Sequence, residues 1–142
     1  MTSDNPLLVA ALSYAARGWA VFPLHTVSAA EHCCTCGSRD CNSPGKHPRT
    51  EHGLKDATVD LETIAAWWEQ WPAANVAIAT GGSSGLVVID VDPRNGGDVS
   101  LIDLEREHGE LPYTLRSQTG GGGEHLIFSH IGGLRGGQHK LG

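Results

Sequence analysis

The stretch Leu86-Val-Val-Ile-Asp-Val-Asp92 decides the fold, because it is the most apolar strand-like segment of the chain. Turn-forming residues flank it at 81–85 and 93–97, so it is predicted to be a buried strand. Side chains alternate along a strand, which puts Asp90 and Asp92 on one face near its carboxyl end. Two adjacent carboxylates repel unless a cation lies between them, and Mg²⁺ or Mn²⁺ prefers oxygen ligands. The pair therefore predicts a divalent metal site. The alternative is that one Asp caps the next turn and the other is solvated.

Helical and extended patterns alternate along the rest of the chain and predict an α+β fold. Helices are expected at residues 6–17, at 60–71, and from 98 or 100 to 108. Further strands are expected at residues 19–24, 75–80, 114–117 and 125–129. We expect these strands to form a mixed, mainly antiparallel sheet flanked by helices.

The expected second helix carries an aromatic stripe. Its members are Ile64, Trp67, Trp68 and Trp71. Tryptophans on one helix face can stack nucleic-acid bases, but at helical spacing they more often pack into a core. We favour the core interpretation.

The composition sets limits on the class of protein. The chain has 142 residues, of which 39% are hydrophobic and 18% charged, which is typical of one globular domain. Its net charge of −6 excludes a generally basic DNA-binding surface, so nucleic-acid contact would depend on local cations or bound metal. No 18-residue apolar run or signal peptide is visible. A membrane partner is therefore not expected, and a cytoplasmic location is expected by default.

All four cysteines fall within ten residues, at positions 33, 34, 36 and 41. Clustered thiols in a reducing compartment more often bind metal than form disulfides. Zinc takes four nitrogen or sulfur ligands in a tetrahedron, and Cys34, Cys36, Cys41 and His47 supply such a set. Cys33 and His32 compete for a place. Residues 32–47 are therefore predicted to be a zinc-binding loop inserted in the domain, in preference to unligated thiols or a catalytic cysteine.

A run of four glycines, 120–123, lies between the last two expected strands. Glycine leaves backbone N–H groups accessible to an anion such as phosphate, although such runs are often only turns. His125 follows at the start of an apolar strand, where a lone histidine is usually structural.

Six segments, taken in order, carry a family resemblance. They are Cys34-Thr-Cys-Gly37, Pro44-Gly-Lys-His-Pro48, Gly53-Leu-Lys-Asp-Ala-Thr58, Ala74-Asn-Val-Ala-Ile-Ala-Thr-Gly81, Gly85-Leu-Val-Val-Ile-Asp-Val-Asp92 and Thr119-Gly-Gly-Gly-Gly-Glu-His125. Together they resemble the N-terminal domain of bifunctional DNA primase/polymerases, the prim-pol branch of the archaeo-eukaryotic primases. The likeness runs from about Ala15 to Phe128.

The resemblance implies template-directed nucleotidyl transfer, in which NTPs or dNTPs are joined into primers on single-stranded DNA. In the family, the acidic pair matching Asp90 and Asp92 binds catalytic Mg²⁺ or Mn²⁺. The histidine matching His125 contacts the triphosphate of the incoming nucleotide, and Gly121, Gly122 and Gly123 are expected to help hold it. The cysteine-rich loop matches a zinc-binding insertion that is structural or assists template contact.

Two departures from the family pattern matter. Many relatives carry Ser two residues before the histidine, where this chain has Gly123. The family also has a third acidic residue in a later strand, within a segment like Val-Asp-x-Arg-Gly-x-Gly-Gly. We expect residues 1–142 to be a prim-pol catalytic domain that is incomplete at its C-terminal end, with a fused or separate helicase as a possible partner.

Two other functions fit parts of the sequence. A non-catalytic, zinc-stabilised nucleic-acid-binding module would bind without metal-dependent turnover. A different Asp-x-Asp enzyme, such as a glycosyltransferase, would use a nucleotide-sugar and no template.

Overall fold

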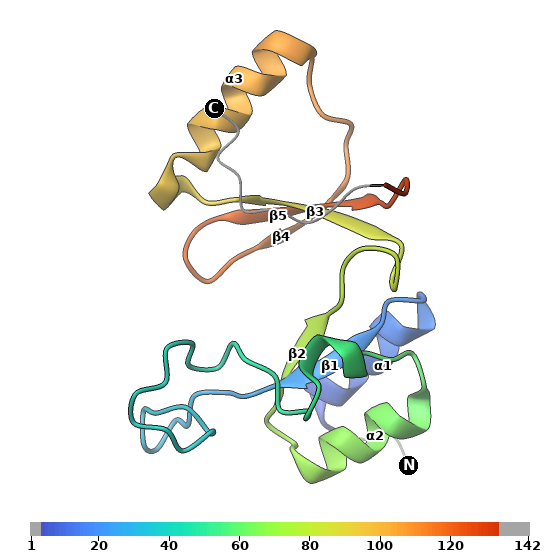
Figure 1. Cartoon of the computed structure of the whole chain (residues 1–142), viewed down its shortest axis with the longest axis vertical. Helices are drawn as coiled ribbons and strands as arrows, with labels where there is room; N and C mark the ends of the chain where they lie inside the picture. Colours follow the sequence, from blue (N-terminus) through green and yellow to red (C-terminus); the bar gives the residue numbers. More distant parts are fainter. Residues whose placement is uncertain (1–3, 134–142) are drawn as a thin grey trace. The chain divides into compact units, whose positions relative to one another are not determined.

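The computed structural model describes residues 4–133, and the chain divides into two compact units, Met1–Ala79 and Thr80–Gly142. Each unit has its own antiparallel sheet, as Figure 1 shows. The expected α+β class is confirmed, but the strands form two sheets and every described strand pair is antiparallel. A tight turn closed by an isolated bridge between Gly81 and Leu86 precedes the first strand of the second unit.

The first unit packs two helices against a two-stranded ribbon. Its elements are α1 (Pro6–Ala16), β1 (Val21–Leu24), the short 3₁₀ helix η1 (Gly53–Asp56), α2 (Leu61–Gln70) and β2 (Asn75–Ile78). The side chain of Asn5 accepts a hydrogen bond from the N–H of Leu7 at the start of α1, and that of Asp60 accepts one from Thr63 at the start of α2. Both caps satisfy N–H groups that a helix start leaves unpaired.

The tryptophan stripe of α2 belongs to the core, as predicted. Trp68 is 2% exposed and packs with Ile64 and with Ala11 of α1, while its indole N–H donates to the carbonyl of Ala74. Trp67 and Trp71 are only partly buried at the edge of this cluster. The stripe therefore holds the two helices on the ribbon, with Trp68 as its most buried member.

The second unit is a three-stranded sheet with one helix. Its elements are β3 (Leu86–Val91), η2 (Pro93–Asn95), α3 (Gly97–His108), β4 (Leu115–Gln118) and β5 (Glu124–Ser129), and the strand order is β3-β5-β4. The α3 helix contacts β3 (Figure 1). β5 is the central strand, because it pairs with β4 along one edge and with β3 along the other.

Strand register divides the side chains of this sheet between two faces. Val91 of β3 pairs with Glu124 of β5, and the next pair, Asp90 with His125, therefore points to the opposite face. Val91 is 6% exposed, and it lines a cavity together with Asp98 of α3. Thus α3 covers the Val91 face at this end of the sheet. None of the helices in the described part of the chain has the length and apolar character needed to span a membrane.

Candidate functional site

Four metal-binding side chains from the loop between β1 and η1 converge in the first unit. They are Cys34, Cys36, Cys41 and His47, and their donor atoms all lie within 4.8 Å of one another. The Nε2 atom of His47 is 3.3 Å from the Sγ of Cys34 and 3.5 Å from the Sγ of Cys41. A tetrahedral zinc with Zn–S bonds of about 2.3 Å separates its sulfur ligands by about 3.8 Å. The predicted clustering is confirmed, and its dimensions and donor set fit zinc.

The two competing residues lie outside this cluster. Cys33 is exposed, and its Sγ donates to a carboxylate oxygen of Glu31 at 3.5 Å. That hydrogen bond raises the pKa of the Cys33 thiol, which favours the protonated form over the thiolate that binds metal. His32 is exposed and has a positive φ of 53° at the turn before Cys33.

Cys34 is the buried member of the cluster, at 3% exposure. Burial raises the pKa of its thiol, but hydrogen bonds from the backbone N–H groups of Gly45 and Cys36, with a further one from His47, outweigh it and bring the pKa to about 6. The loop fold therefore favours the thiolate, the form that binds zinc.

The cluster is tied to the sheet of the first unit by Asn75. Its side-chain amide donates to the carbonyl of His25 at 3.3 Å and to that of Gly45 at 3.0 Å. The ring of His25 also lies 4.4 Å, centroid to centroid, from the ring of His47. Asn75 of β2 therefore attaches the loop at His25 and at Gly45. Such outer-shell contacts orient metal ligands in proteins.

In the second unit, Asp90 and His125 are direct neighbours on one face of the sheet. They occupy paired positions on β3 and β5, and 3.5 Å separates Oδ1 of Asp90 from Nε2 of His125. The side chains keep 67% and 44% of their exposure, respectively. Two residues 35 positions apart in the sequence thus meet at a site open to solvent.

Asp92 lies just beyond β3, where it caps η2. Its Oδ1 accepts from the backbone N–H of Arg94 at 3.0 Å, and its Oδ2 accepts from the side chain of Asn95 at 2.7 Å. The N–H of Arg94, followed by the side chains of Asn95 and Arg94, holds the pKa of Asp92 below its usual value. In this structure Asp92 therefore follows the capping alternative. The only cluster of three or more candidate ligands within residues 4–133 is the Cys/His cluster, so Asp90 and Asp92 do not form a closed cage.

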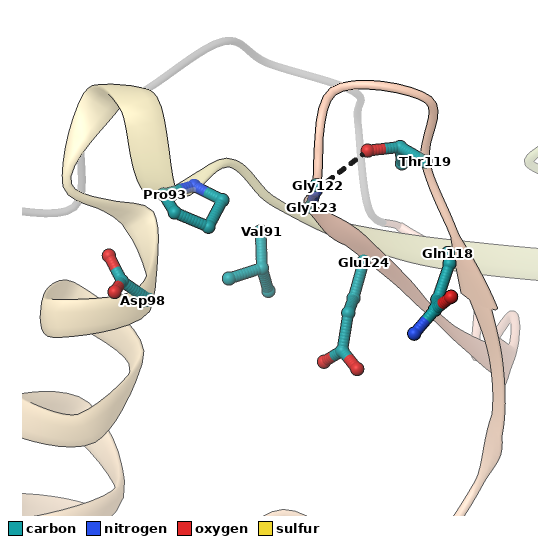
Figure 2. A pocket seen from close by; sticks show the side chains of 8 residues that line it. All are labelled: Val91, Pro93, Asp98, Gln118, Thr119, Gly122, Gly123 and Glu124. Carbon is teal, nitrogen blue, oxygen red and sulfur yellow. Dashed lines mark hydrogen bonds between the residues drawn. The ribbon is translucent and has the colours of Figure 1, made fainter.

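The glycine run forms the turn between β4 and β5, and the turn uses some of its own N–H groups. Gly122 donates to the carbonyl of Thr119 at 3.1 Å, and Gly123 donates to the hydroxyl of Thr119 at 2.9 Å, the bond drawn in Figure 2. Within the described residues, the N–H groups of Gly120 and Gly121 make no hydrogen bond. Of the three glycines expected to bind nucleotide, only Gly121 has an N–H without a partner among the described residues. Nucleotide binding by the turn stays a prediction.

Gly123, which departs from the family's Ser, is fixed by a close approach. A Cβ at this position would collide with the carbonyl oxygen of Val91 and lie 3.0 Å from Oγ1 of Thr119. Gly97 is similar, because a Cβ there would lie 2.8 Å from the backbone N of Asp92. Both glycines allow other chain segments to pack against the end of β3 that carries the acidic residues.

The family described as bifunctional DNA primase/polymerase, N-terminal, matches residues 11–141, nearly the whole chain. The chain belongs to this primase/polymerase family. No curated protein and no solved structure matches it.

A cavity of about 300 Å³ lies beside the primase/polymerase acidic pair, but on the face opposite Asp90 and His125. Figure 2 shows its wall of side chains from β3, α3 and the glycine turn. The lining residues are Val91, Pro93, Asp98, Gln118, Thr119, Gly122, Gly123 and Glu124. Two acidic side chains line this cavity, which makes it a poor place for a triphosphate.

Three residues of this primase/polymerase chain gain importance only in the structure. Thr119 closes the glycine turn, Asn75 anchors the Cys/His loop, and Arg94 lies between Asp92 and the glycine turn. Arg94 carried one sequence signal, since it is the first cation after the acidic pair. No local pattern marks Asn75, because its partners lie 30 and 50 residues away.

Proposed function

We propose that this chain joins nucleotides into primers, and extends them, on a single-stranded DNA template. Family membership supports this activity. The observation that carries it is the pairing of Asp90 with His125 across β3 and β5. The family resemblance assigns metal binding to the first residue and triphosphate contact to the second, and catalysis needs these two functions side by side.

Asp90 and Asp92 are the residues that would hold Mg²⁺ or Mn²⁺. Their carboxylates offer the oxygen donors that such ions prefer, and both side chains are accessible, at 67% and 31% exposure. The bound metal would neutralise charge on the reacting phosphate oxygens. Because two carboxylates leave most coordination positions free, we expect the nucleotide's phosphates to complete the site and tighten metal binding.

The remaining contributions come from positioning. The Nε2 atom of His125 lies 3.5 Å from Oδ1 of Asp90, so a phosphate oxygen beside Asp90 would be within reach of the same ring. Gly121, with its free N–H, would hold the triphosphate from the neighbouring turn. Phosphoryl transfer depends mainly on such positioning and charge neutralisation.

We further propose that the Cys/His cluster holds one Zn²⁺. The ion would fold a loop that has no regular secondary structure of its own between β1 and η1. A four-ligand protein site leaves no open position for catalysis, so its role is structural. The loop could then contribute to template contact without taking part in the chemistry.

The expected partners are single-stranded DNA and NTPs or dNTPs, with a fused or separate helicase as a further candidate. The net charge of −6 implies that template binding relies on local cations and metal. DNA binding by this chain should therefore depend on the divalent ion more strongly than DNA binding by a generally basic protein does.

Metal-dependent nucleotide binding tests the proposal. Wild-type protein is titrated with ATP and with dATP, each with and without Mg²⁺, and Asp90→Asn is compared with Asp103→Asn. Asp103 lies on α3 and its side chain is 64% exposed, so it is a matched control. We expect nucleotide binding to need Mg²⁺ and to be lost in Asp90→Asn alone. Binding that ignores both metal and Asp90 would contradict the proposal.

Primer synthesis on single-stranded DNA separates this activity from the second candidate, a zinc-stabilised nucleic-acid-binding module. The module is favoured by the lack, within residues 4–133, of a third acidic group clustered with Asp90 and Asp92. It predicts DNA binding without Mg²⁺-dependent nucleotide binding. Family membership gives no support to a nucleotide-sugar transferase.

A further inference from the structure

Arg94 lies against the glycine turn of the second unit. A Cβ built on Gly121 would be 2.6 Å from Nη2 of Arg94 and 2.9 Å from its Cζ. The guanidinium group therefore occupies the space that a side chain at Gly121 would fill. The turn residue and the cation come from segments 27 positions apart in the sequence.

Asp92, one member of the acidic pair, holds the base of this arginine. The backbone N–H and the Nε atom of Arg94 lie 3.0 and 3.4 Å, respectively, from Oδ1 of Asp92. In the described part of the chain, neither Nη1 nor Nη2 makes a hydrogen bond, and the side chain is 72% exposed. Asp92 thus orients the guanidinium group through its Nε atom, and the two terminal nitrogens of the planar fork remain available to a ligand.

The glycine turn next to this guanidinium group also has unpaired backbone donors. The N–H groups of Gly120 and Gly121 are unpaired within residues 4–133, whereas those of Gly122 and Gly123 are taken by Thr119. A guanidinium fork next to unpaired backbone N–H groups is suited to phosphate oxygens. The nearest acidic group, Asp92, already accepts from Arg94 and Asn95, which reduces its repulsion of an anion.

We infer that Arg94 is a phosphate-binding residue that, with the turn at Gly120 and Gly121, holds the outer phosphates of the nucleotide next to Asp92. This inference deepens the proposed function and rests on it. Arg94 contacts both the carboxylate expected to bind metal and the turn expected to bind triphosphate. It therefore couples the two halves of the site.

Phosphate probes and matched variants test the inference. Wild type, Arg94→Ala, Arg94→Lys and Arg106→Ala are titrated with ATP plus Mg²⁺, with adenosine, and with inorganic tripolyphosphate. Arg106 pairs with Asp103 on α3 and is 75% exposed, so its removal controls for net charge. We expect Arg94→Ala to weaken ATP and tripolyphosphate binding about tenfold to a hundredfold, as for loss of charged hydrogen bonds. Adenosine binding should not change, and Arg94→Lys should recover only part of the loss because it lacks the fork.

Gly121→Ala provides an independent arm. Gly121 does not have a positive φ, and the added Cβ meets only the flexible end of Arg94, so the fold should persist. The variant should weaken tripolyphosphate binding, and its effect should not add to that of Arg94→Ala. Additive effects would overturn the coupling.

The outcomes separate the inference from the function on which it rests. If Arg94→Ala bound ATP and tripolyphosphate as tightly as Arg106→Ala does, the inference would be overturned. The proposed function would still stand if ATP binding depended on Asp90. A change in Mn²⁺ binding alone, with tripolyphosphate binding intact, would also overturn it, because Arg94 would then act only on Asp92. Arg94-dependent tripolyphosphate binding without metal-dependent ATP binding would keep the phosphate site and remove the proposed function.

Discussion

Asp90 and His125 occupy directly opposite positions on β3 and β5, with 3.5 Å between Oδ1 and Nε2. A shift of one residue in this register would send one of them to the Val91 face, because strand side chains alternate. The buried residues Val91 and Leu126 fix the register from the other face. The packing of apolar residues therefore determines that the two polar groups meet.

Substitutions at this pair should separate metal binding from nucleotide binding. We expect His125→Ala to weaken binding of ATP plus Mg²⁺ by about tenfold, while Mn²⁺ affinity, measured by electron paramagnetic resonance, changes less than twofold. Asp90→Asn should reduce both, since it removes a charge that the metal needs. His108→Ala, an exposed histidine of α3, is the control. If His125→Ala lost metal binding as fully as Asp90→Asn, the division of roles would be wrong.

The Cys/His cluster should carry one zinc per chain when reduced protein is analysed by mass spectrometry. Cys34→Ser should lose the metal, whereas Cys33→Ser should retain it, because only Cys33 lies outside the cluster. Chelation should increase hydrogen exchange in residues 32–47 and leave β3 protected. Zinc-free protein with an ordered loop would refute the metal assignment.

Asn75→Ala should weaken the attachment of that loop without removing a ligand. We expect the zinc content of the variant to stay near one per chain as purified, but its zinc to be lost to a chelator about tenfold faster or more, as for removal of an outer-shell partner. Asn42→Ala changes the same residue type within the loop, where Asn42 has no hydrogen bond to the sheet. Equal release rates in the two variants would show that Asn75 does not stabilise the site.

Trp68 should contribute more to stability than Trp71. Trp68→Ala removes a side chain that is 2% exposed, and we expect it to lower the free energy of unfolding by about 3–5 kcal/mol. Trp71→Ala should cost clearly less, because Trp71 is half-buried and lies under Arg49. Urea denaturation followed by circular dichroism measures both. A smaller loss in Trp68→Ala than in Trp71→Ala would contradict the packing described for α2.

The cap of α2 should make stability depend on pH. The Thr63 hydroxyl, followed by its backbone N–H, lowers the pKa of Asp60 below 3.8, its usual value. The carboxylate therefore stabilises the folded state above pH 3.8, and this contribution is lost as the pH falls through the lower folded-state pKa. The urea midpoint of Asp60→Asn should thus differ most from that of wild type above pH 3.8, and the two midpoints should converge in acid. A constant difference at all pH values would exclude the linkage.

The sequence determined the elements and the chemistry of the ligands. The apolar run 86–91 forms a strand, the caps at Asn5 and Asp60 start helices, and the four predicted zinc ligands lie close together. These features depend on near neighbours in the chain, where side-chain period, capping and donor type act directly.

Only the tertiary structure decided which distant polar groups meet. Asp90 lies opposite His125, and Arg94 comes to lie on Gly121. Each outcome depends on the β3–β5 register and on close backbone approaches such as that of Gly123 to Val91. Such contacts join residues about 30 positions apart, and they form only when burial of the sheet's apolar face fixes the register.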